Sequence, residues 1–390
     1  MGDTLDTGLQ FGVASSEEEF DGLRAEWGGL LEHCPTTTVF NTWEWLRCWW
    51  EHYGSDRPLA IVWARRGGAL RALFPLWIER EVWKGVIPFR TLRLLGDGSN
   101  DSDYLDFLIS DEEGERTVEA FWSYLFERSG LRFDLIRICE MPVESPHYRA
   151  LRALLARRGA TVREQRIGAV SSSLPGDWDQ FVARLKPRMR TKVRSLRRRL
   201  EEAHRLRFSR AETPTDIDAA LESLFALHSR RWSRRSESGV FAKSEKRAFY
   251  RAMSQRFGAS GSLRLFTLEV DGHPAAHEHC VARGDTVYLL QEGYDPVWEE
   301  HGVGNVLRAM VLEECIREGF RTYDFLGGVT QHKRSWGGEI KESARFTCRG
   351  TSAWGGIYIG LTGASVLLDR LRRRTAPPSG GPVGGSPQEA

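Results

Sequence analysis

Alternating hydrophobic and polar residues predict β-strands through much of the first 140 residues. Residues 59–64 and 70–78 alternate on either side of Arg66-Gly67-Gly68, so we expect an antiparallel hairpin here. Residues 42–52, TWEWLRCWWEH, have helical spacing instead, and their four tryptophans are typical of a core, with stacking on a sugar or base as the alternative. The other elements predicted in this half are strands at 11–13, 92–95, 104–109 and 133–138, a helix capped by Ser16, and helices at 119–128 and 148–157.

The second half begins with helices and continues into antiparallel strands. Asp177 is placed to cap a short helix, and residues 216–233 and 246–257 are apolar at helical spacing. Residues 263–270, 274–282 and 286–291 predict three strands, the first two joined by the turn Asp271-Gly272. A helix that starts near Gly302 and ends near Gly319 follows, and then a strand at 322–326. This order of elements predicts an α+β fold class.

A chain of 390 residues is longer than a single core usually supports, so we expect two domains. The hydrophobic content of 41% and the charged content of 28% are typical of globular proteins. The segment Ser171 to Gly176, SSSLPG, predicts a crossing between the halves. We therefore predict an N-terminal domain at 1–170, a C-terminal domain at 171–372, and a disordered tail at 373–390 that is rich in Pro, Gly and Ser.

Positive charge is concentrated in residues 184–210, which hold twelve Lys or Arg against two acids, although the net charge of the chain is +2. From Arg188 to Arg205 the sequence predicts a helix with a thin apolar stripe and arginine on its other faces. Because clustered arginines bind phosphates, the candidate partners are a tRNA arm, an anionic membrane surface or the acidic part of a cofactor. No aromatic residues interleave with these arginines to stack on bases, so DNA is not expected; a solvated helix paired with acids is the alternative.

Several other classes of protein and site are disfavoured. The six cysteines are scattered without a C-x-x-C pair, which argues against a disulfide framework or a zinc ribbon and favours a reducing compartment. The acidic N-terminus lacks the basic region and apolar run of a signal peptide. Residues 350–368 are uncharged and precede Arg370, but five glycines make them weakly apolar, so we expect a last strand and a packed terminal helix instead of a membrane span. The loop from Gly96 to Tyr104 has three aspartates but lacks the distal glutamate of a calcium loop, and no metal is expected.

One helix start is suited to binding phosphate. Gly302, Val303, Gly304 and Asn305 follow a strand and open a helix, where backbone N–H groups lack helical partners and glycines let a ligand come close. A plain tight turn is the alternative, because Gly-x-Gly alone is common. We expect Lys333, beside Arg334, to contact phosphates or an anionic substrate.

A strand near the middle of the second half carries His277-Glu278-His279. Side chains alternate along a strand, so the two histidines share one face and Glu278 points to the other. The histidines have no third metal ligand placed by sequence. A single ionisable residue at a cleft suffices as a general base if its pKa is shifted.

Four motifs follow one another in a fixed order: Tyr294-Asp295-Pro296, Gly302-Val303-Gly304-Asn305-Val306-Leu307, Tyr323-Asp324-Phe325-Leu326-Gly327-Gly328 and His332-Lys333-Arg334-Ser335-Trp336. Over roughly residues 177–349 the chain resembles the GNAT-type acyltransferases of the CelD/BcsL group, bacterial proteins linked to exopolysaccharide or cellulose production and distantly related to the FemAB aminoacyl transferases. The resemblance implies an α+β fold of tandem GNAT-like domains with mixed, mainly antiparallel sheets. It also implies acetyl-CoA or another acyl-CoA as co-substrate.

The resemblance further assigns roles to single residues. Gly302 to Asn305 match the CoA pyrophosphate loop, although Glu300-His301 stand where the family often has serine-proline. A carboxylate on the central strand often acts as base in related transferases, which makes Glu278 the first candidate and His279 the second. Tyr294 is a candidate to protonate the leaving thiolate, and Asp324 to orient an amine or a main-chain group.

We therefore predict an N- or O-acyltransferase that acts on an amino sugar, a glycan precursor or a similar polar acceptor. Its expected location is cytoplasmic or peripheral at the inner face of the membrane. One alternative is FemAB-like transfer of an amino acid from aminoacyl-tRNA, although the FemAB coiled-coil arm is not visible in this sequence. The other is a non-catalytic scaffold of a polysaccharide-export system. The acceptor, the acyl length and the oligomeric state do not follow from the sequence.

Overall fold

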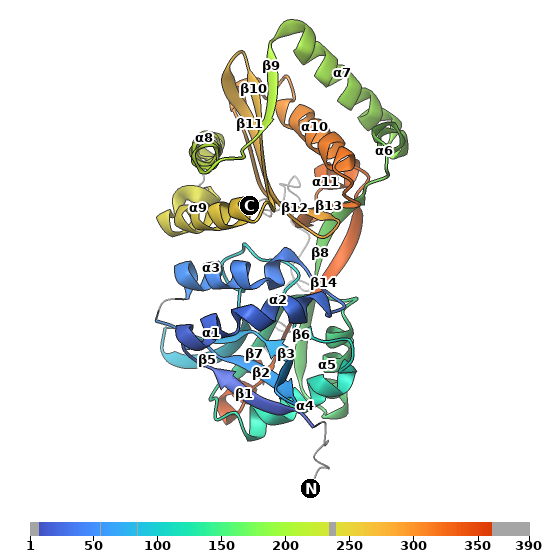
Figure 1. Cartoon of the computed structure of the whole chain (residues 1–390). Helices are drawn as coiled ribbons and strands as arrows, with labels where there is room; N and C mark the ends of the chain where they lie inside the picture. Colours follow the sequence, from blue (N-terminus) through green and yellow to red (C-terminus); the bar gives the residue numbers. More distant parts are fainter. Residues whose placement is uncertain (1–7, 55, 84, 234–238, 361–390) are drawn as a thin grey trace, which may run out of the picture. The chain divides into compact units, whose positions relative to one another are not determined.

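The computed structural model of the protein describes residues 8–54, 56–83, 85–233 and 239–360, which form two compact units (Figure 1). Within these residues, unit 1 consists of 8–43, 54–167 and 342–360, and unit 2 of 44–53 and 168–341. The tail predicted at 373–390 and residues 361–368 of the uncharged segment lie outside the described residues. Among the described residues, no helix combines the length and hydrophobicity that a membrane span requires.

Unit 1 contains two groups of paired strands. The first is antiparallel, in the order β1 (Gln10–Ala14), β2 (Ile61–Arg66), β3 (Ala69–Phe74), β6 (Leu108–Ile109). The second has the order β4 (Leu76–Trp83), β5 (Ile87–Leu94), β7 (Leu135–Pro142), β14 (Glu339–Arg349), in which β5 and β7 are parallel. The strand predicted at 70–78 is thus divided at Pro75, since proline has no N–H for a sheet ladder. The strand predicted at 104–109 is confirmed at Leu108 and Ile109 alone.

The helices of unit 1 are α1 (Glu17–Gly22), α2 (Arg24–Glu32), α4 (Gly114–Glu127) and α5 (Pro146–Arg157). The predicted cap of α1 is confirmed, because Glu19 N donates to Ser16 Oγ at 3.2 Å and Ser16 N donates to a Glu19 carboxylate oxygen at 3.1 Å. A further helix occupies residues 353–360, which confirms the helix predicted in the uncharged segment, whereas the last strand ends before that segment, at Arg349.

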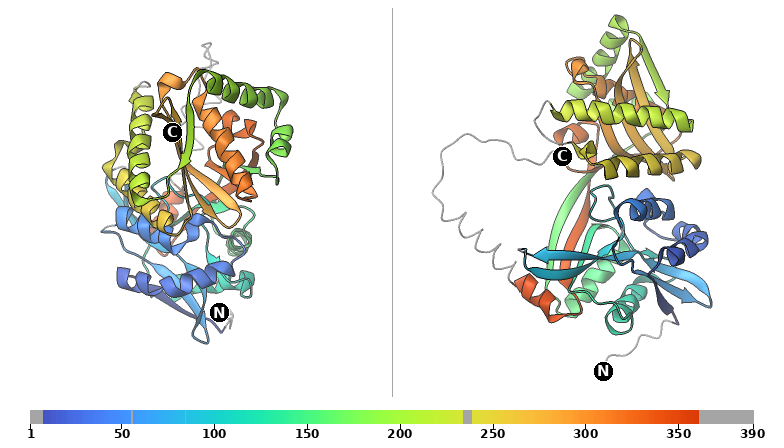
Figure 2. Two further views of the ribbon diagram at one scale, coloured as in Figure 1. Left: turned by 45° about the horizontal axis from the view of Figure 1, so that its top comes forward. Right: turned by 90° about the vertical axis from the view of Figure 1, so that its left-hand side faces the viewer.

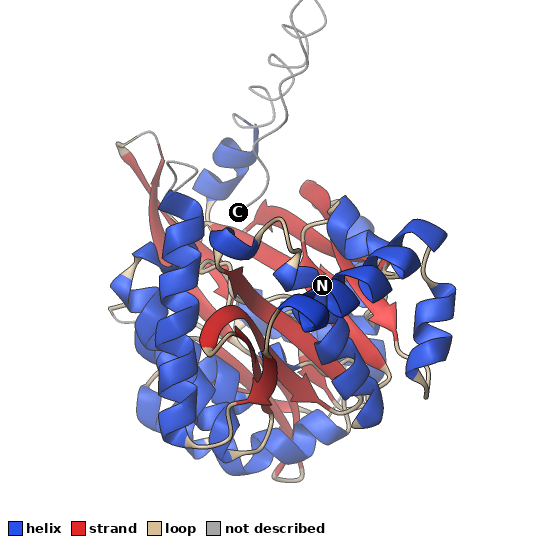
Figure 3. Ribbon diagram, turned by 90° about the horizontal axis from the view of Figure 1, so that it is seen from above, coloured by secondary structure: helices blue, strands red, loops and turns tan. Residues whose placement is uncertain are grey.

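Unit 2 is a layered structure with helices on both faces of a mixed sheet (Figures 1 and 3). The strand order is β8 (Val162–Ser173), β13 (Thr322–Gly327), β12 (Thr286–Tyr294), β11 (His273–Arg283), β10 (Leu263–Val270), β9 (Leu206–Arg210), and each pair is antiparallel except β12 with β13. Ser171 to Ser173, which we expected in a crossing, are part of β8 and pair with β13. Their place in a sheet ladder satisfies backbone groups that a loop would leave to water.

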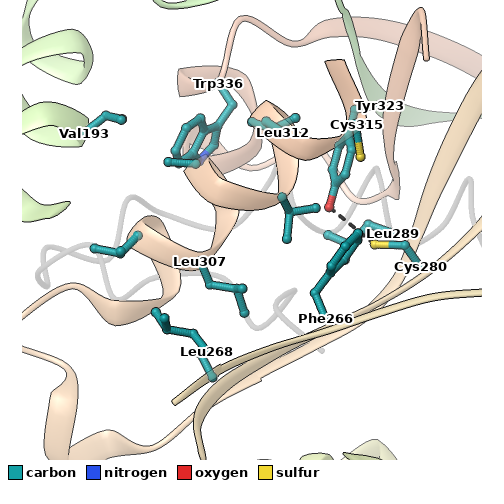
Figure 4. Packing of buried hydrophobic residues seen from close by; sticks show 14 of the residues in the cluster. Val193, Phe266, Leu268, Cys280, Leu289, Leu307, Leu312, Cys315, Tyr323 and Trp336 are labelled. Carbon is teal, nitrogen blue, oxygen red and sulfur yellow. Dashed lines mark hydrogen bonds between the residues drawn. The ribbon is translucent and has the colours of Figure 1, made fainter. Parts of the chain in front are cut away.

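Two helices, α8 (Pro214–Ser233) and α9 (Ser244–Ala259), lie side by side on one face of this sheet (Figure 2). The opposite face is covered by α10 (Val303–Arg317), with α7 (Pro187–Ala203) packed on α10. The shorter helices of unit 2 are α6 (Trp178–Arg184), capped by Asp177 as predicted, and α11 (Gln331–Ser335). Apolar side chains of α7, α10 and the strands form one core, part of which Figure 4 shows.

The tryptophan-rich segment forms α3 (Trp43–Tyr53), and its prediction as core is confirmed. Trp45 and Trp49 are fully buried and Trp50 nearly so. Within unit 2, the Trp45 ring packs edge-on against Phe249 of α9 with centroids 5.5 Å apart. These rings therefore hold α3 to α9 and are not available to stack on a ligand.

Strands β12 and β13 pair in parallel over three positions, Thr286 to Tyr288 with Thr322 to Asp324. Beyond them no further pairing joins these strands in the described residues, and α10 connects them. Unit 1 repeats the arrangement, since β5 pairs in parallel with β7 over Thr91 to Arg93 and α4 stands between them in sequence. Each unit thus contains an antiparallel strand pair followed by a helix and a parallel strand.

Candidate active site

A cavity of about 280 Å³ opens beside the start of α10 in unit 2. Its walls come from the end of α8, from β11 and β12, from the start of α10, and from α11. The polar and loop residues that line it include Arg231, Glu278, Glu292, Tyr294, Glu299, Gly302, Val303, Gly304, Asn305 and His332. The helix start and Tyr294, which we predicted from sequence, are therefore brought together in one cavity.

The start of α10 is shaped by Gly302, which has a left-handed backbone with φ of 64°. A side chain here would be strained, and its Cβ would lie 2.7 Å from Leu196 of α7. The N–H groups of Asn305 and Val306 both donate to Gly302 O, whereas those of Val303 and Gly304 make no hydrogen bond within the described residues. Two donors at the positive end of the helix dipole thus border the cavity.

A buried arginine lies under the cavity. The side chains of Arg308 on α10 and Glu278 on β11 are each 1% exposed, and Arg308 Nε donates to Glu278 Oε1 at 2.6 Å. The same guanidinium donates to Glu292 on β12, and Tyr323 OH donates to the second oxygen of Glu278 at 2.8 Å. Burial raises the pKa of Glu278, an effect that the Arg308 charge opposes. Both oxygens of Glu278 are therefore engaged, which suits a structural role better than proton abstraction.

Glu292 also lines the cavity, and 41% of its side chain is accessible. Burial alone would raise its pKa, but the charges of Arg308 and Arg231 outweigh burial and lower the pKa below its ordinary value. Glu292 is therefore an ionised group anchored from below by Arg308. It lies one strand away from Glu278, directly opposite it in the β11–β12 register.

His332 on α11 lines the same cavity. Desolvation lowers the pKa of His332, Glu292 acts in the opposite direction, and nearby cations including Arg308 and Lys192 lower it further. A histidine with a lowered pKa is a neutral imidazole at physiological pH, and a neutral imidazole accepts protons. Glu292 and His332 together offer an anion and a base at one wall.

The two histidines of β11 lie on the other face of the sheet, as the alternation predicted. His277 bonds with Thr267 Oγ1 at 3.0 Å and Ser223 Oγ at 2.8 Å, and His279 bonds with Ser254 Oγ at 2.7 Å. Burial lowers the pKa of each to about 4, so both are neutral. His279 is fully buried against α9 and does not line the cavity, so its position gives no support to a role as base.

The other predicted residues divide between the cavity and the framework. Tyr294 borders the cavity; its OH donates to Glu299 at 3.3 Å, and the Arg231 guanidinium lies 4.8 Å from its ring centre. Asp324 is 1% exposed, accepts from Leu326 N at 2.8 Å and lies 3.6 Å from Lys341 Nζ, so it fixes the end of β13. Lys333 donates to the carbonyls of Leu326 and Gly327 and does not line the cavity.

The arginine-rich helix α7 packs along α10, close to this helix start. Part of its charge is compensated, since Arg197 pairs with Glu201 and Glu313, and Arg198 lies 3.7 Å from Glu202. The side chains of its first half that form no ion pair within the described residues are Arg188, Arg190, Lys192 and Arg194. The basic helix is thus neutralised at its C-terminal half and uncompensated at its N-terminal half.

These residues fit the pyrophosphate and thioester of an acyl-CoA. The two N–H donors of the helix start, Arg231 and the cationic first half of α7 favour an anion, whereas Glu299 at the rim opposes one. Bound acyl-CoA would supply an activated acyl carbonyl to the cavity. Gly304 leaves room for such a ligand, because a Cβ there would come no closer than 3.6 Å to Tyr294.

The corresponding helix start in unit 1 has the opposite charge. Helix α4 begins after Glu113 and carries Glu115 in its first turn. Glu112 and Glu113 pair with Arg71 and Arg66, respectively. Acids at a helix N-terminus are stabilised by the dipole, and they also repel phosphate. Among the described residues, the helix start that is suited to phosphate is therefore the one in unit 2.

Two groups of potential metal ligands are better explained by other contacts. Cys48, Glu51 and His52 of α3 have ligand atoms within 4.8 Å of one another, but burial raises the pKa of the Cys48 thiol to about 12 and Glu51 pairs with Arg47 and Arg256. In the aspartate loop at 96–104, Asp97 pairs with Arg93 at 2.7 Å. These contacts engage one carboxylate of each group, Glu51 in α3 and Asp97 in the loop.

Four residues were not predicted as site residues from the sequence. Three of them, Arg231, Glu292 and His332, line the cavity, and the fourth, Arg308, binds the carboxylates of Glu278 and Glu292. Their signals were present, since Glu292 and His332 stand within or beside the motifs of the predicted β-loop-α-β unit. A carboxylate one strand from Glu278 could have been found by continuing the alternation into β12. Arg308 on the helix could be found only with the packing in hand.

Comparison with known proteins agrees with this arrangement. Residues 187–334 match the family model of the acetyltransferase (GNAT) domain. No curated protein matches the sequence. Among solved structures, FemX superposes with a TM-score of 0.63 at 11% identity, covering 86% of this chain and 98% of FemX. L-PGS from Bacillus licheniformis superposes with a TM-score of 0.52 at 12% identity, covering 90% of this chain and 97% of L-PGS.

The similar structures show the fold, and the family model identifies the domain that holds the cavity. The predicted fold class is confirmed: a mixed α/β chain of GNAT-like units with mixed, mainly antiparallel sheets. The cavity, the helix start and both ionisable candidates at 292 and 332 lie inside the matched segment. Residues 187–334 are similar to a GNAT acetyltransferase domain, and this match supports an acyltransferase activity for the chain.

Proposed function

We propose that this chain is an acyl-CoA-dependent N- or O-acyltransferase of the CelD/BcsL type, which acts in the cytoplasm on an amino sugar, a glycan precursor or a similar polar acceptor in exopolysaccharide production. One observation carries the proposal. A single cavity is lined both by the two unpaired N–H groups at the start of α10 and by the ionised Glu292 and the neutral His332. The first pair suits the phosphates of the donor, and the second suits the acceptor.

An amine acceptor fits this wall better than a hydroxyl. A protonated amine pairs with the Glu292 carboxylate, which Arg308 holds in place. A nitrogen of His332 takes the proton, so that the amine lone pair can attack the acyl carbonyl. The Tyr294 hydroxyl, at the rim of the same cavity, is the candidate donor to the thiolate that leaves as the carbon–sulfur bond breaks, and the second proton that the nitrogen loses as the amide forms restores this hydroxyl.

Calorimetric titration with acetyl-CoA and longer acyl-CoAs tests the donor site. We expect wild type and Gly304→Ala to bind alike, because the alanine methyl group makes an ordinary contact with Tyr294. Gly304→Trp should not bind, since the indole fills the space in front of the free N–H groups. Equal binding by all three proteins, or none by any, would remove the donor claim.

The acceptor is tested by release of the CoA thiol with matched sugars. Glucosamine has a free amine, whereas N-acetylglucosamine offers hydroxyl groups only. Turnover with the first and not with the second supports N-transfer, and equal turnover with both contradicts the role given to Glu292.

FemAB-like transfer from aminoacyl-tRNA is the second candidate, favoured by the uncompensated side chains at the start of α7. If it holds, tRNA binding will weaken steeply with salt, and neutralising Arg188, Arg190 and Arg194 will flatten the slope by about 0.7–0.9 per lost phosphate contact. Arg198→Gln is the matched control, because Arg198 already pairs with Glu202. Salt-independent binding excludes this candidate.

A non-catalytic scaffold of an export complex predicts a filled cleft. The open cavity of about 280 Å³, with Glu278 and Tyr294 among its walls, favours an enzyme instead. The scaffold would be supported if the intact chain released no CoA thiol with any amine tested and bound no acyl-CoA.

A further inference from the structure

An exposed apolar surface lies on unit 1, apart from the residues that line the cavity of unit 2. Trp354 and Ile357 of the helix at 353–360 are 58% and 49% exposed. We call these two residues the tryptophan surface. Two large apolar side chains exposed together on one face of a short helix mark a candidate contact with a partner.

The helix is fixed to the β4–β5 hairpin by its other side. Tyr358 packs edge-on against Trp83 and Phe89, with ring centres 5.8 and 5.0 Å apart, and Ile359 is buried with Phe89. Figure 2 (right) shows the helix beside this hairpin. Gly355 permits the close approach, since a Cβ there would lie 1.8 Å from Asp134 O. Trp354 and Ile357 are three residues apart and therefore share one helix face, which this packing leaves outside.

Two arginines lie beside this helix. Arg349 donates to Ser352 O at 3.2 Å, and Arg163 donates to Ile359 O at 3.3 Å, so both guanidinium groups lie against it.

The sequence after this helix also combines apolar residues at helical spacing with arginines. Beyond the described residues, Leu361, Leu368 and Leu371 continue the helical spacing that begins with Trp354 and Ile357. Arg370 and residues 372–374, all arginine, come next. Apolar residues at helical spacing with an adjacent arginine cluster are typical of segments that lie in a membrane interface.

We propose that the tryptophan surface docks unit 1 on an anionic phospholipid bilayer. Tryptophan and tyrosine are enriched at the headgroup level, where an apolar ring and a polar edge are both satisfied. Arginines around an apolar surface attract anionic headgroups and bind their phosphates bidentately. This surface belongs to unit 1 alone and does not depend on the acyltransferase proposal.

Sedimentation of the full chain with vesicles tests the proposal. The vesicles are phosphatidylcholine alone or phosphatidylcholine with 30% phosphatidylglycerol. We expect at least tenfold stronger binding to the anionic vesicles at 0.1 M salt and a marked loss at 0.5 M. The double variant Trp354→Ser, Ile357→Ser should weaken binding at least tenfold. Val297→Ser, an equally exposed valine of unit 2, is the matched control and should bind as wild type does.

Three results would overturn the proposal. The first is no sedimentation with either vesicle. The second is wild-type binding by the double variant together with loss on neutralising Arg372, Arg373 and Arg374, which would assign binding to the tail. The third is a dimer in light scattering that the double variant dissociates while vesicle binding is absent, which would assign the surface to a second copy of the chain.

Discussion

Replacing Arg308 by methionine is the most informative perturbation of this protein. The substitution keeps an unbranched side chain on α10, where α10 packs on β11 and β12. It removes the positive charge that pairs with Glu278. In the native chain the Arg308 and Glu278 side chains are both 1% exposed and are joined at 2.6 Å. Removing one partner of a buried pair costs about 3–5 kcal/mol, because the remaining charge is left without compensation. For a unit of this size, that corresponds to a fall of roughly 10 °C in the unfolding midpoint.

The pH dependence distinguishes this explanation from a simple packing defect. Burial raises the pKa of Glu278 in the folded state, and the variant lacks the Arg308 charge that opposes this rise. A raised carboxyl pKa contributes stability that is present at low pH and is lost as the pH rises through the folded-state pKa. The deficit of Arg308→Met relative to wild type should therefore be largest at pH 8 and shrink towards pH 5.

Urea unfolding at several pH values measures the effect, with the double variant Glu278→Gln, Arg308→Met as control. Because the double variant buries no unpaired charge, it should recover more than half of the lost stability and lose the pH dependence of the deficit. The reasoning is refuted if Arg308→Met costs under about 1 kcal/mol. It is also refuted if its deficit is the same at pH 5 and pH 8.

Three further outcomes are expected. His332→Gln should lower kcat by roughly 10²–10⁴, measured as CoA release, with wild-type thermal stability as the control. Because the pKa of His332 is lowered, the acid limb of the kcat/KM profile should lie below pH 6.5 in wild type and vanish in His332→Gln. Gly302→Val should destabilise unit 2 by about 1–3 kcal/mol, since it combines a φ of 64° with a contact to Leu196, whereas Gly304→Ala should be neutral in the same melting assay. Trp45→Ala should cost about 3–5 kcal/mol, read from chemical denaturation, because its ring is fully buried; Trp354→Ala, which is 58% exposed, should be within error of wild type.

Elements with strong periodicity were predictable from sequence. The amphipathic helix α8 and the hairpin β10–β11 lie where spacing and the Asp271-Gly272 turn placed them, and Ser16 and Asp177 cap helices as local chemistry required. The strand β14 was missed, because Glu339 to Glu342 are exposed at its start and give no apolar alternation there. Its assignment depends on pairing with β7, about two hundred residues earlier in the chain, which no local pattern encodes.

The part of the candidate site that backbone geometry determines, the start of α10, was predictable from the sequence. Glycines after a strand and before a helix place N–H donors whatever the surroundings are. Backbone geometry does not decide which carboxylate of β11 or β12 is open to the cavity. That depends on the side chains that pack on each strand. Arg308 closes off Glu278 and leaves Glu292 open to the cavity, and that distinction arises from the α10–sheet contact rather than from strand alternation.

The acidic first turn of α4 affects how many acyl-CoA molecules one chain is expected to bind. The two units share an antiparallel pair, a connecting helix and a parallel strand, yet Glu113 and Glu115 stand at the start of α4, whereas the first turn of α10 holds no acid. A duplicated fold with one charge-reversed copy should saturate at a stoichiometry of one acyl-CoA per chain. Unit 1 then does not have to keep a ligand-binding site. Its surface residues can change while the candidate active site of unit 2 is preserved.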